Sequence, residues 1–83
     1  MEDELGQYEL VEELGQGGMA TVYRAHSRGC WYAVKLAKEG FDQAIAREAQ
    51  MLQKIRHKNV ARYVSHGTGF LVTELIQGAG LRK

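Results

Sequence analysis

Residues 15–22 read GQGGMATV, and this stretch decides the fold. Its glycines allow a tight turn and let the backbone approach a ligand closely. β-branched and aromatic residues follow at 21–23, and residues 8–15 before the turn alternate weakly, so we expect a strand on each side. A Rossmann motif is excluded because it needs a helix after its glycines, and a P-loop is excluded because no lysine follows them. The stretch predicts a glycine turn (residues 15–20) between two antiparallel strands.

The rest of the chain divides into further strands and one helix. Residues 27–29 read SRG and form a turn before a third strand at 31–36, which completes a meander. Asp42 is expected to cap a helix rich in helix-forming residues, and glycines at 66–69 separate two final strands. The helix, these two strands and a closing linker are expected at residues 43–56, 60–65, 70–75 and 77–80. The predicted fold class is α+β, a five-stranded antiparallel sheet with one helix.

Composition limits the classes of partner. The chain has 83 residues and a net charge of +1, from 11 Lys and Arg against 10 Asp and Glu, so we expect neither nucleic acid nor a membrane as partner. Cys30 is the single cysteine, which excludes an internal disulfide and a zinc-ligand cluster, and we expect no metal site. The acidic start and the lack of an apolar run of about 18 residues predict a cytoplasmic protein.

The third predicted strand carries a pattern suited to a nucleotide. Ala33 and Lys35 are two residues apart and share a strand face, about 6 to 7 Å from each other along the strand. A flat base could rest beside the alanine while a phosphate meets the lysine. The alternatives are a solvated surface lysine and a glycine hairpin that binds nothing, and the turn alone does not separate them.

The predicted helix argues for a paired lysine. The apolar residues of the helix form one stripe, made of Ile45, Ala49, Leu52 and Ile55. Glu48 falls within this stripe, so its carboxylate is directed at the core. No cation lies three or four residues from Glu48, and an unpaired buried carboxylate is costly. We therefore predict an ion pair between Glu48 and Lys35, with a half-exposed Glu48 at the edge of the stripe as the alternative.

Taken together, these residues resemble the N-terminal, ATP-binding lobe of eukaryotic-like serine/threonine protein kinases, especially the bacterial-type sequences whose glycine loop reads G-x-G-G-M-[AS]-x-V-Y. The resemblance is carried by landmarks in a fixed order: the glycine turn ending in Val22 and Tyr23, AVK at 33–35, the helix with Glu48, RHKNV at 56–60, LVTEL at 71–75 and GAGL at 78–81. It implies a kinase-like small lobe with one αC-type helix.

The resemblance implies a role for each matching residue. Lys35 would hold the α- and β-phosphates of ATP and Glu48 would position it, which makes these two the catalytic pair. The apolar groups above the adenine would be Leu14, Val22 and Ala33. The phosphates would be covered by the backbone amides of Gly15, Gln16, Gly17, Gly18, Met19 and Ala20. Thr73 would gate the pocket behind the adenine, and Glu74 and Ile76 would bind the base from a hinge at about 74–78.

The sequence also departs from the family. Ala20 replaces a third glycine, Lys58 stands where a proline is frequent, and the stretch between Lys35 and Glu48 is short. No part of the chain resembles H-R-D-x-x-x-x-N, D-F-G or A-P-E, the large-lobe motifs that supply the base and the Mg²⁺ ligands. Residues 1–83 would therefore be a small lobe without its large lobe, inactive alone, and Mg²⁺ would bind only with that lobe.

Two functions remain open on these residues. The first is the ATP-binding lobe of a protein serine/threonine kinase, whose partners are ATP and the missing large lobe. The second is a stand-alone kinase-like module that binds another kinase and modulates it. In either case apolar side chains that normally face a partner would be bare, so self-association is expected as well.

Overall fold

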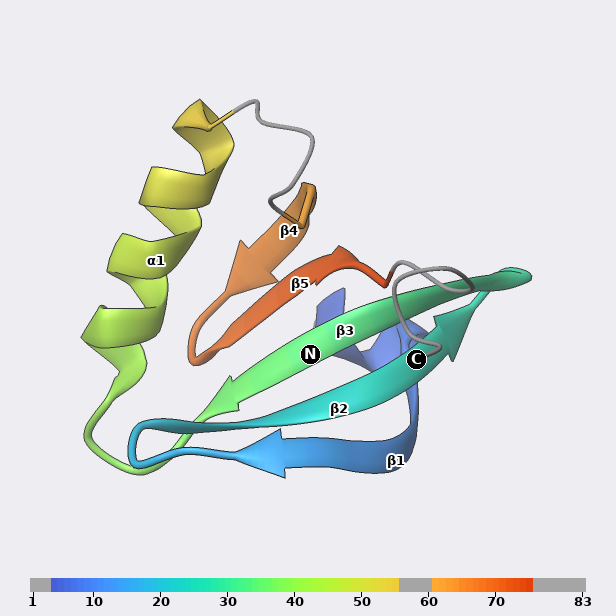
Figure 1. Cartoon of the computed structure of the whole chain (residues 1–83), viewed down its shortest axis with the longest axis horizontal. Coiled ribbons are helices and arrows are strands. Elements are labelled where there is room, and N and C mark those ends of the chain that lie inside the picture. Colours follow the sequence, from blue (N-terminus) through green and yellow to red (C-terminus); the bar gives the residue numbers. More distant parts are fainter. Residues whose placement is uncertain (1–3, 56–60, 76–83) are drawn as a thin grey trace, which may run out of the picture.

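The protein is described by a computed structural model over residues 4–55 and 61–75. These residues form one five-stranded antiparallel sheet in the order β1-β2-β3-β5-β4, one α-helix and a short 3-10 helix (Figure 1). The strands are β1 (Glu9–Gln16), β2 (Ala20–Ser27), β3 (Cys30–Ala37), β4 (Tyr63–Gly67) and β5 (Phe70–Glu74), and the helices are η1 (Glu4–Gln7) and α1 (Asp42–Lys54). The predicted fold class is confirmed.

The first three strands form the predicted meander, and β5 adds to the far side of β3. Val22 on β2 lies opposite Lys35 on β3, and Lys35 lies opposite Leu71 on β5. Directly opposed residues of antiparallel strands point to the same face of the sheet. Lys35 is thus placed on the central strand of the sheet, with one neighbour on each side.

Each face of the sheet carries its own hydrophobic core. On the face with Lys35, helix α1 packs against β3, β4 and β5, as Figure 1 shows. That core consists of Ala20, Ile45, Ala49 and Leu71. On the other face, the N-terminal residues Leu5 and Tyr8 cover a second core made of Ala25, Val34, Phe70 and Val72. The helix is therefore anchored on one face of the sheet, and the glycine turn lies beside the helix.

The start of α1 differs from the prediction. Asp42 is not the cap but the first residue of the helix, and the preceding Phe41 occupies the capping position without a side-chain hydrogen bond. The carboxylate of Asp42 instead faces the turn after β4, where a Cβ on Gly69 would come within 3.1 Å of its Oδ1. Its negative charge still lies in the first turn of the helix, where the helix dipole favours it.

The end of the predicted apolar stripe also differs. Ile45 and Ala49 are buried, and Leu52 packs against the same core, as predicted. Ile55 lies beyond the last residue of α1, has an extended backbone and is 40% exposed, so its inclusion in the buried stripe was wrong. The helix was also predicted two residues too long, since it ends at Lys54. The fourth predicted strand differs as well: residue 60 lies outside the described residues, residues 61 and 62 are not in a strand, and β4 continues through His66 and Gly67, which were expected in the turn.

The turn between β2 and β3 is tighter than predicted. Ser27 pairs with Cys30 at the end of the ladder, so the turn itself consists of Arg28 and Gly29 alone. Both have positive φ, 54° and 83°, the combination that a two-residue hairpin of the primed type requires. Ser27 therefore belongs to the strand, where it is buried.

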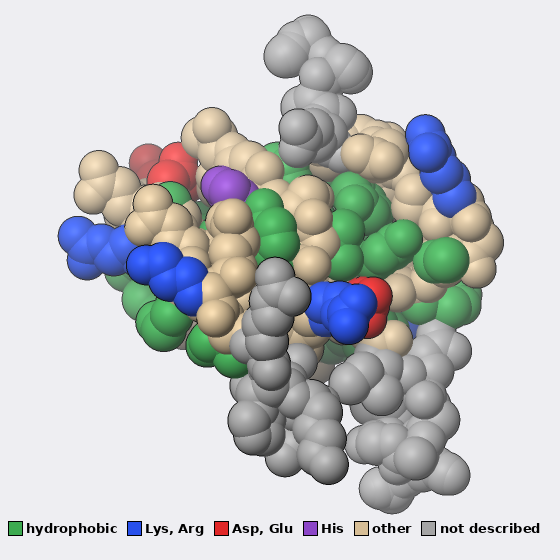
Figure 2. Space-filling model, turned by 90° about the horizontal axis from the view of Figure 1, so that it is seen from above, with side chains coloured by type: hydrophobic (Ala, Val, Ile, Leu, Met, Phe, Trp, Pro, Cys, Tyr) green, Lys and Arg blue, Asp and Glu red, His purple; other side chains and the backbone are tan. Residues whose placement is uncertain are grey.

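Several large hydrophobic side chains remain at the surface. Figure 2, which shows the molecule from above, has such side chains exposed between charged ones. Across the described residues, the exposed large hydrophobic side chains are Leu10, Val11, Leu14, Met19, Phe41, Met51 and Ile55. In the same residues, no helix has the length and apolar character needed to cross a membrane.

Candidate functional site

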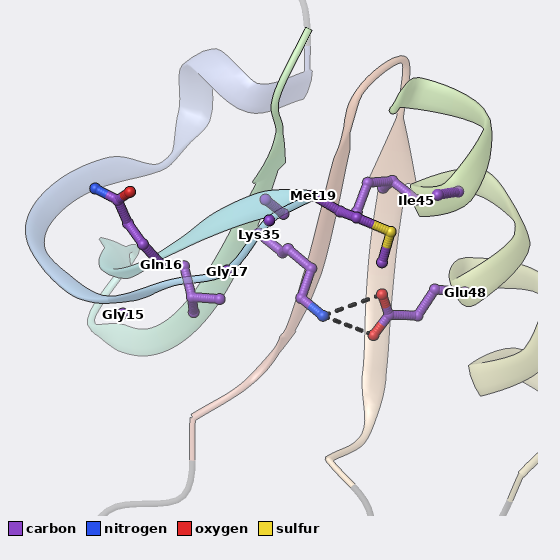
Figure 3. A pocket seen from close by; sticks show the side chains of 11 residues that line it. Gly15, Gln16, Gly17, Met19, Lys35, Ile45 and Glu48 are labelled. Atoms are coloured by element: carbon purple, nitrogen blue, oxygen red, sulfur yellow. Dashed lines mark hydrogen bonds and ion pairs between the residues drawn. The ribbon is translucent and has the colours of Figure 1, made fainter. Parts of the chain in front are cut away.

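A cavity of about 400 Å³ opens between the glycine turn and helix α1 (Figure 3). The residues that line it come from β1, the turn, β2, β3 and α1. They are Gly15, Gln16, Gly17, Gly18, Met19, Ala20, Val22, Lys35, Ala44, Ile45 and Glu48. The structure therefore brings the whole predicted glycine turn into one cavity with both members of the predicted ion pair.

The predicted ion pair between Lys35 and Glu48 is confirmed. The ammonium of Lys35 donates to both carboxylate oxygens of Glu48, at 3.0 Å to Oε1 and 2.8 Å to Oε2 (Figure 3). The two side chains are 33% and 37% exposed, so Glu48 is less buried than the prediction had it. Glu48 lies at the edge of the stripe, next to the buried Ala49, and reaches outward to the lysine.

Local contacts hold the glycine turn in place. The N–H of Gly17 donates to the carbonyl of Ala20 at 2.9 Å, and the N–H of Lys38 donates to the carbonyl of Met19 at 2.8 Å. A Cβ added at Gly15 or Gly18 would meet no atom within 4 Å, and neither residue has a positive φ. The packing of the chain itself therefore leaves free space above these two glycines.

The cavity is also lined by side chains that were not predicted from the sequence to belong to the site. Met19 was expected to contribute its backbone, but its side chain points from the turn toward Ile45 and Glu48 (Figure 3). Ala44 and Ile45 on α1 complete this wall. Helical spacing could have indicated Ala44, because it precedes Glu48 by one turn and so lies on the same side of the helix.

Of the described residues predicted for the adenine end, Val22 lines this cavity and the others lie outside it. Ala33 shares the face of Lys35 and lies opposite Thr73 on β5. Leu14 on β1 is 46% exposed, and Glu74 ends β5, where its N–H donates to the carbonyl of Arg62. The predicted hinge residue Ile76 lies outside the described residues. Ala33 and Thr73 thus continue the face that carries Lys35, while Leu14 lies two residues before the end of β1 and Glu74 is the last residue of β5, opposite Tyr32.

Tyr32, on the sheet face opposite to Lys35, has a raised pKa. Burial raises the pKa of the Tyr32 phenol above its ordinary value of 10.0, and the neighbouring Cys30 thiol raises this pKa further. The ring of Tyr32 also packs edge-on against Tyr8, with centroids 5.2 Å apart. Within residues 4–55 and 61–75, no group of three or more His, Cys, Asp or Glu side chains is arranged to hold a metal ion.

Comparison with known proteins identifies the family. Residues 8–83 match the family model described as protein tyrosine and serine/threonine kinase. The chain is 37% identical over 70 residues to interleukin-1 receptor-associated kinase 1 of Bos taurus, a match that covers 74% of this chain and 10% of that protein. It is 33% identical over 69 residues to cyclin-dependent kinase 9 of Homo sapiens, which covers 75% of this chain and 18% of that protein.

A third relative matches over more of the chain. Cell division control protein 2 homolog 3 of Trypanosoma brucei brucei is 30% identical over 87 residues, which covers 92% of this chain and 28% of that protein. The chain thus spans less than a third of the length of each of these relatives. With its sheet, its helix and the match over residues 8–83, this chain belongs to the protein tyrosine and serine/threonine kinase family and has the fold of the N-terminal kinase lobe.

Proposed function

We propose that this chain is the nucleotide-binding lobe of a protein serine/threonine kinase, with ATP as its ligand. The observation that carries the proposal is the cavity in which the glycine turn faces the Lys35–Glu48 ion pair. Joined to a large lobe, it would take part in phosphoryl transfer from ATP to protein hydroxyl groups. The relatives are themselves named as kinases, which favours this function over a module that regulates another kinase.

The ion pair is suited to hold a phosphate. An ammonium group has three N–H donors, and Glu48 accepts from Lys35 through both of its oxygens. This contact fixes the direction of the lysine and leaves donor capacity for an anion in the cavity. Because both side chains are about one-third exposed, a ligand can reach the ammonium without displacing core residues.

The glycine turn supplies the second half of the phosphate site. Free space above Gly15 and Gly18 allows a ligand to approach the backbone where a side chain would block it. Backbone N–H groups in such a turn are good donors to phosphate oxygens. Met19 and Ile45 add apolar side chains to the wall of the cavity beside the ion pair.

The adenine would lie along the same face of the sheet, toward the start of β3. Val22 lies opposite Lys35, and Ala33 lies two residues before Lys35 on the same face. We propose that these two residues and Leu14 contact the base, that Thr73 limits the space behind it, and that Glu74 and Ile76 bind its edge through their backbones. Residues 1–83 would then form the small lobe, with the hinge at about 74–78.

The catalytic base and the Mg²⁺ ligands belong to the large-lobe motifs, which this sequence does not contain. Mg²⁺, when bound with a large lobe, neutralises charge on the phosphates. The chain's own residues bind and orient the nucleotide: Lys35 through its ammonium and the turn through its amides. The exposed hydrophobic side chains would contact the large lobe or, in its absence, a second copy of the chain.

Amide chemical shifts of the 83-residue chain during titration with ATP test this function. We expect weak binding, nearly independent of Mg²⁺, with shifts at residues 15–20 and at Lys35. Lys35→Met should weaken binding about tenfold or more, since it removes a charge-assisted contact, whereas the exposed Lys54→Met should not. The absence of ATP-dependent shifts at these residues would contradict the proposal, and so would radiolabel transfer to a protein by this chain alone.

A further inference from the structure

We propose that Lys38 is a positioning residue that braces the glycine turn from its outer side and sets the turn's height above the cavity. The role concerns the same site and so rests on the proposed function. Three sets of contacts carry it: those of the Lys38 backbone, those of its side chain, and those that continue from it into α1.

The backbone of Lys38 is fixed at both of its hydrogen-bonding groups. Its N–H donates to the carbonyl of Met19 in the glycine turn at 2.8 Å, and its own carbonyl accepts from the N–H of Phe41 at 2.9 Å. Lys38 directly follows the end of β3, so it is also tied to the central strand of the sheet. The side chain of Lys38 therefore starts from a defined position.

That side chain reaches the first part of the glycine turn. The ammonium of Lys38 donates to Oε1 of Gln16 at 3.2 Å, and Nε2 of Gln16 donates to Oε2 of Glu13 at 3.1 Å. The side chain of Gln16 points away from the Lys35–Glu48 pair (Figure 3), so this chain of contacts runs on the outside of the turn. Lys38 thus holds the turn on both sides. Its backbone binds Met19, and its side chain binds Gln16.

The contacts continue into the helix that carries Glu48. Phe41, which donates to Lys38, occupies the N-cap position of α1, and its carbonyl accepts from the N–H of Ile45 at 3.2 Å. A continuous series of hydrogen bonds therefore leads from Gln16 through Lys38 and Phe41 to Ile45, which lines the cavity. The turn and the start of the helix are placed relative to each other through Lys38.

Charge favours this role over a second ion pair. In the described part of the chain, the two salt bridges are Lys35 with Glu48 and Arg24 with Glu12, and the hydrogen bond of the Lys38 side chain goes to the neutral amide of Gln16. An ammonium that donates to an amide keeps its full charge, and a hydrogen bond to a charged group is stronger than one between neutral groups. The brace thus holds Gln16 without neutralising the positive charge beside the phosphate-binding turn.

A double-mutant cycle tests the brace. Lys38→Met and Gln16→Ala should each weaken ATP binding about two- to fivefold, because the contact is exposed, and leave adenosine binding unchanged, because the turn covers only the phosphates. The double variant should be no weaker than either single one, and Lys38→Arg should restore binding. The matched controls are Lys54→Met and Gln53→Ala on the exposed side of α1.

Hydrogen exchange gives a readout that does not depend on nucleotide. The amides of Gly17 and Lys38 donate within the braced turn, so both should exchange at least threefold faster in Lys38→Met and Gln16→Ala than in the wild type. Unchanged exchange at both amides, additive losses of ATP affinity, or equal losses for ATP and adenosine would overturn the brace. If the wild type does not bind ATP, the proposed function fails, and the exchange rates alone decide this inference.

Discussion

The ammonium of Lys35 donates to both carboxylate oxygens of Glu48, and this contact joins the central strand to the helix in the wall of the cavity. Glu48→Gln preserves the shape of the side chain but removes its charge. Because the pair is about one-third exposed, we expect the free energy of unfolding to fall by no more than about 1 kcal/mol. ATP affinity should fall roughly three- to tenfold, since the lysine is no longer held in place.

Thermal melts and nucleotide titrations of the same samples separate these two effects. The matched control is Glu39→Gln, a change at an exposed residue that precedes α1. A loss of stability well above 1 kcal/mol with unchanged ATP binding would mean that the ion pair serves the fold and not the ligand.

Gly67 is required by the ring that lies against it. A Cβ at this position would come 2.7 Å from Cζ of Phe70, a buried core side chain that cannot move aside freely. Gly67→Ala should therefore destabilise the protein by about 1 to 3 kcal/mol, the usual cost of overpacking. Gly18→Ala is the control, because its Cβ would meet nothing within 4 Å. Equal melting temperatures for the two variants would contradict this packing.

Leu71 joins the sheet to helix α1, since it is 2% exposed and belongs to the same core as Ile45 and Ala49. Leu71→Ala should cost about 2 to 5 kcal/mol, a large part of the stability of a domain this small. The same change at Leu10, which is 37% exposed on β1, should cost far less. Urea unfolding followed by circular dichroism measures both, and similar midpoints would show that the helix is not anchored by Leu71.

The raised pKa of Tyr32 predicts a change of stability at alkaline pH. A phenol whose pKa is higher in the folded chain contributes stability that is complete below pH 10 and is lost as the pH rises through its folded value. Ultraviolet titration should show a tyrosine component above pH 10 that Tyr32→Phe removes. A titration curve that Tyr32→Phe leaves unchanged above pH 10 would contradict the desolvation of Tyr32.

Local sequence patterns predict most of the sheet correctly. Glycines and β-branched residues have short-range effects, so the glycine turn, the meander and the final hairpin follow from them. The ion pair was also predicted, from an acidic residue inside an apolar stripe that would need a partner from another element, although the structure places Glu48 at the edge of that stripe with its side chain 37% exposed. The turn at Arg28 and Gly29 is placed less well, since its length depends on how Ser27 and Cys30 pair across the strands.

Other features depend on how the helix lies on the sheet. Aspartate is a residue type that often caps helices, but the carboxylate of Asp42 faces the turn near Gly69, a residue far away in the sequence. Ile55 continues the helical spacing, but the helix ends at Lys54. Ile45 lines the cavity only because α1 crosses close to the glycine turn. Such contacts are tertiary, and residue spacing alone does not contain them.

The strand order has a consequence for folding. β1, β2 and β3 pair with their neighbours in sequence, and so do β4 and β5, but the contact between β3 and β5 closes a long loop that contains α1. Contacts between residues distant in the sequence form slowly because loop closure costs entropy. The pairing of Lys35 with Leu71 belongs to that late step. The step that completes the sheet therefore also brings the helix with Glu48 to Lys35. Before this step the chain has a three-stranded meander and a separate, marginally stable hairpin, and no cavity.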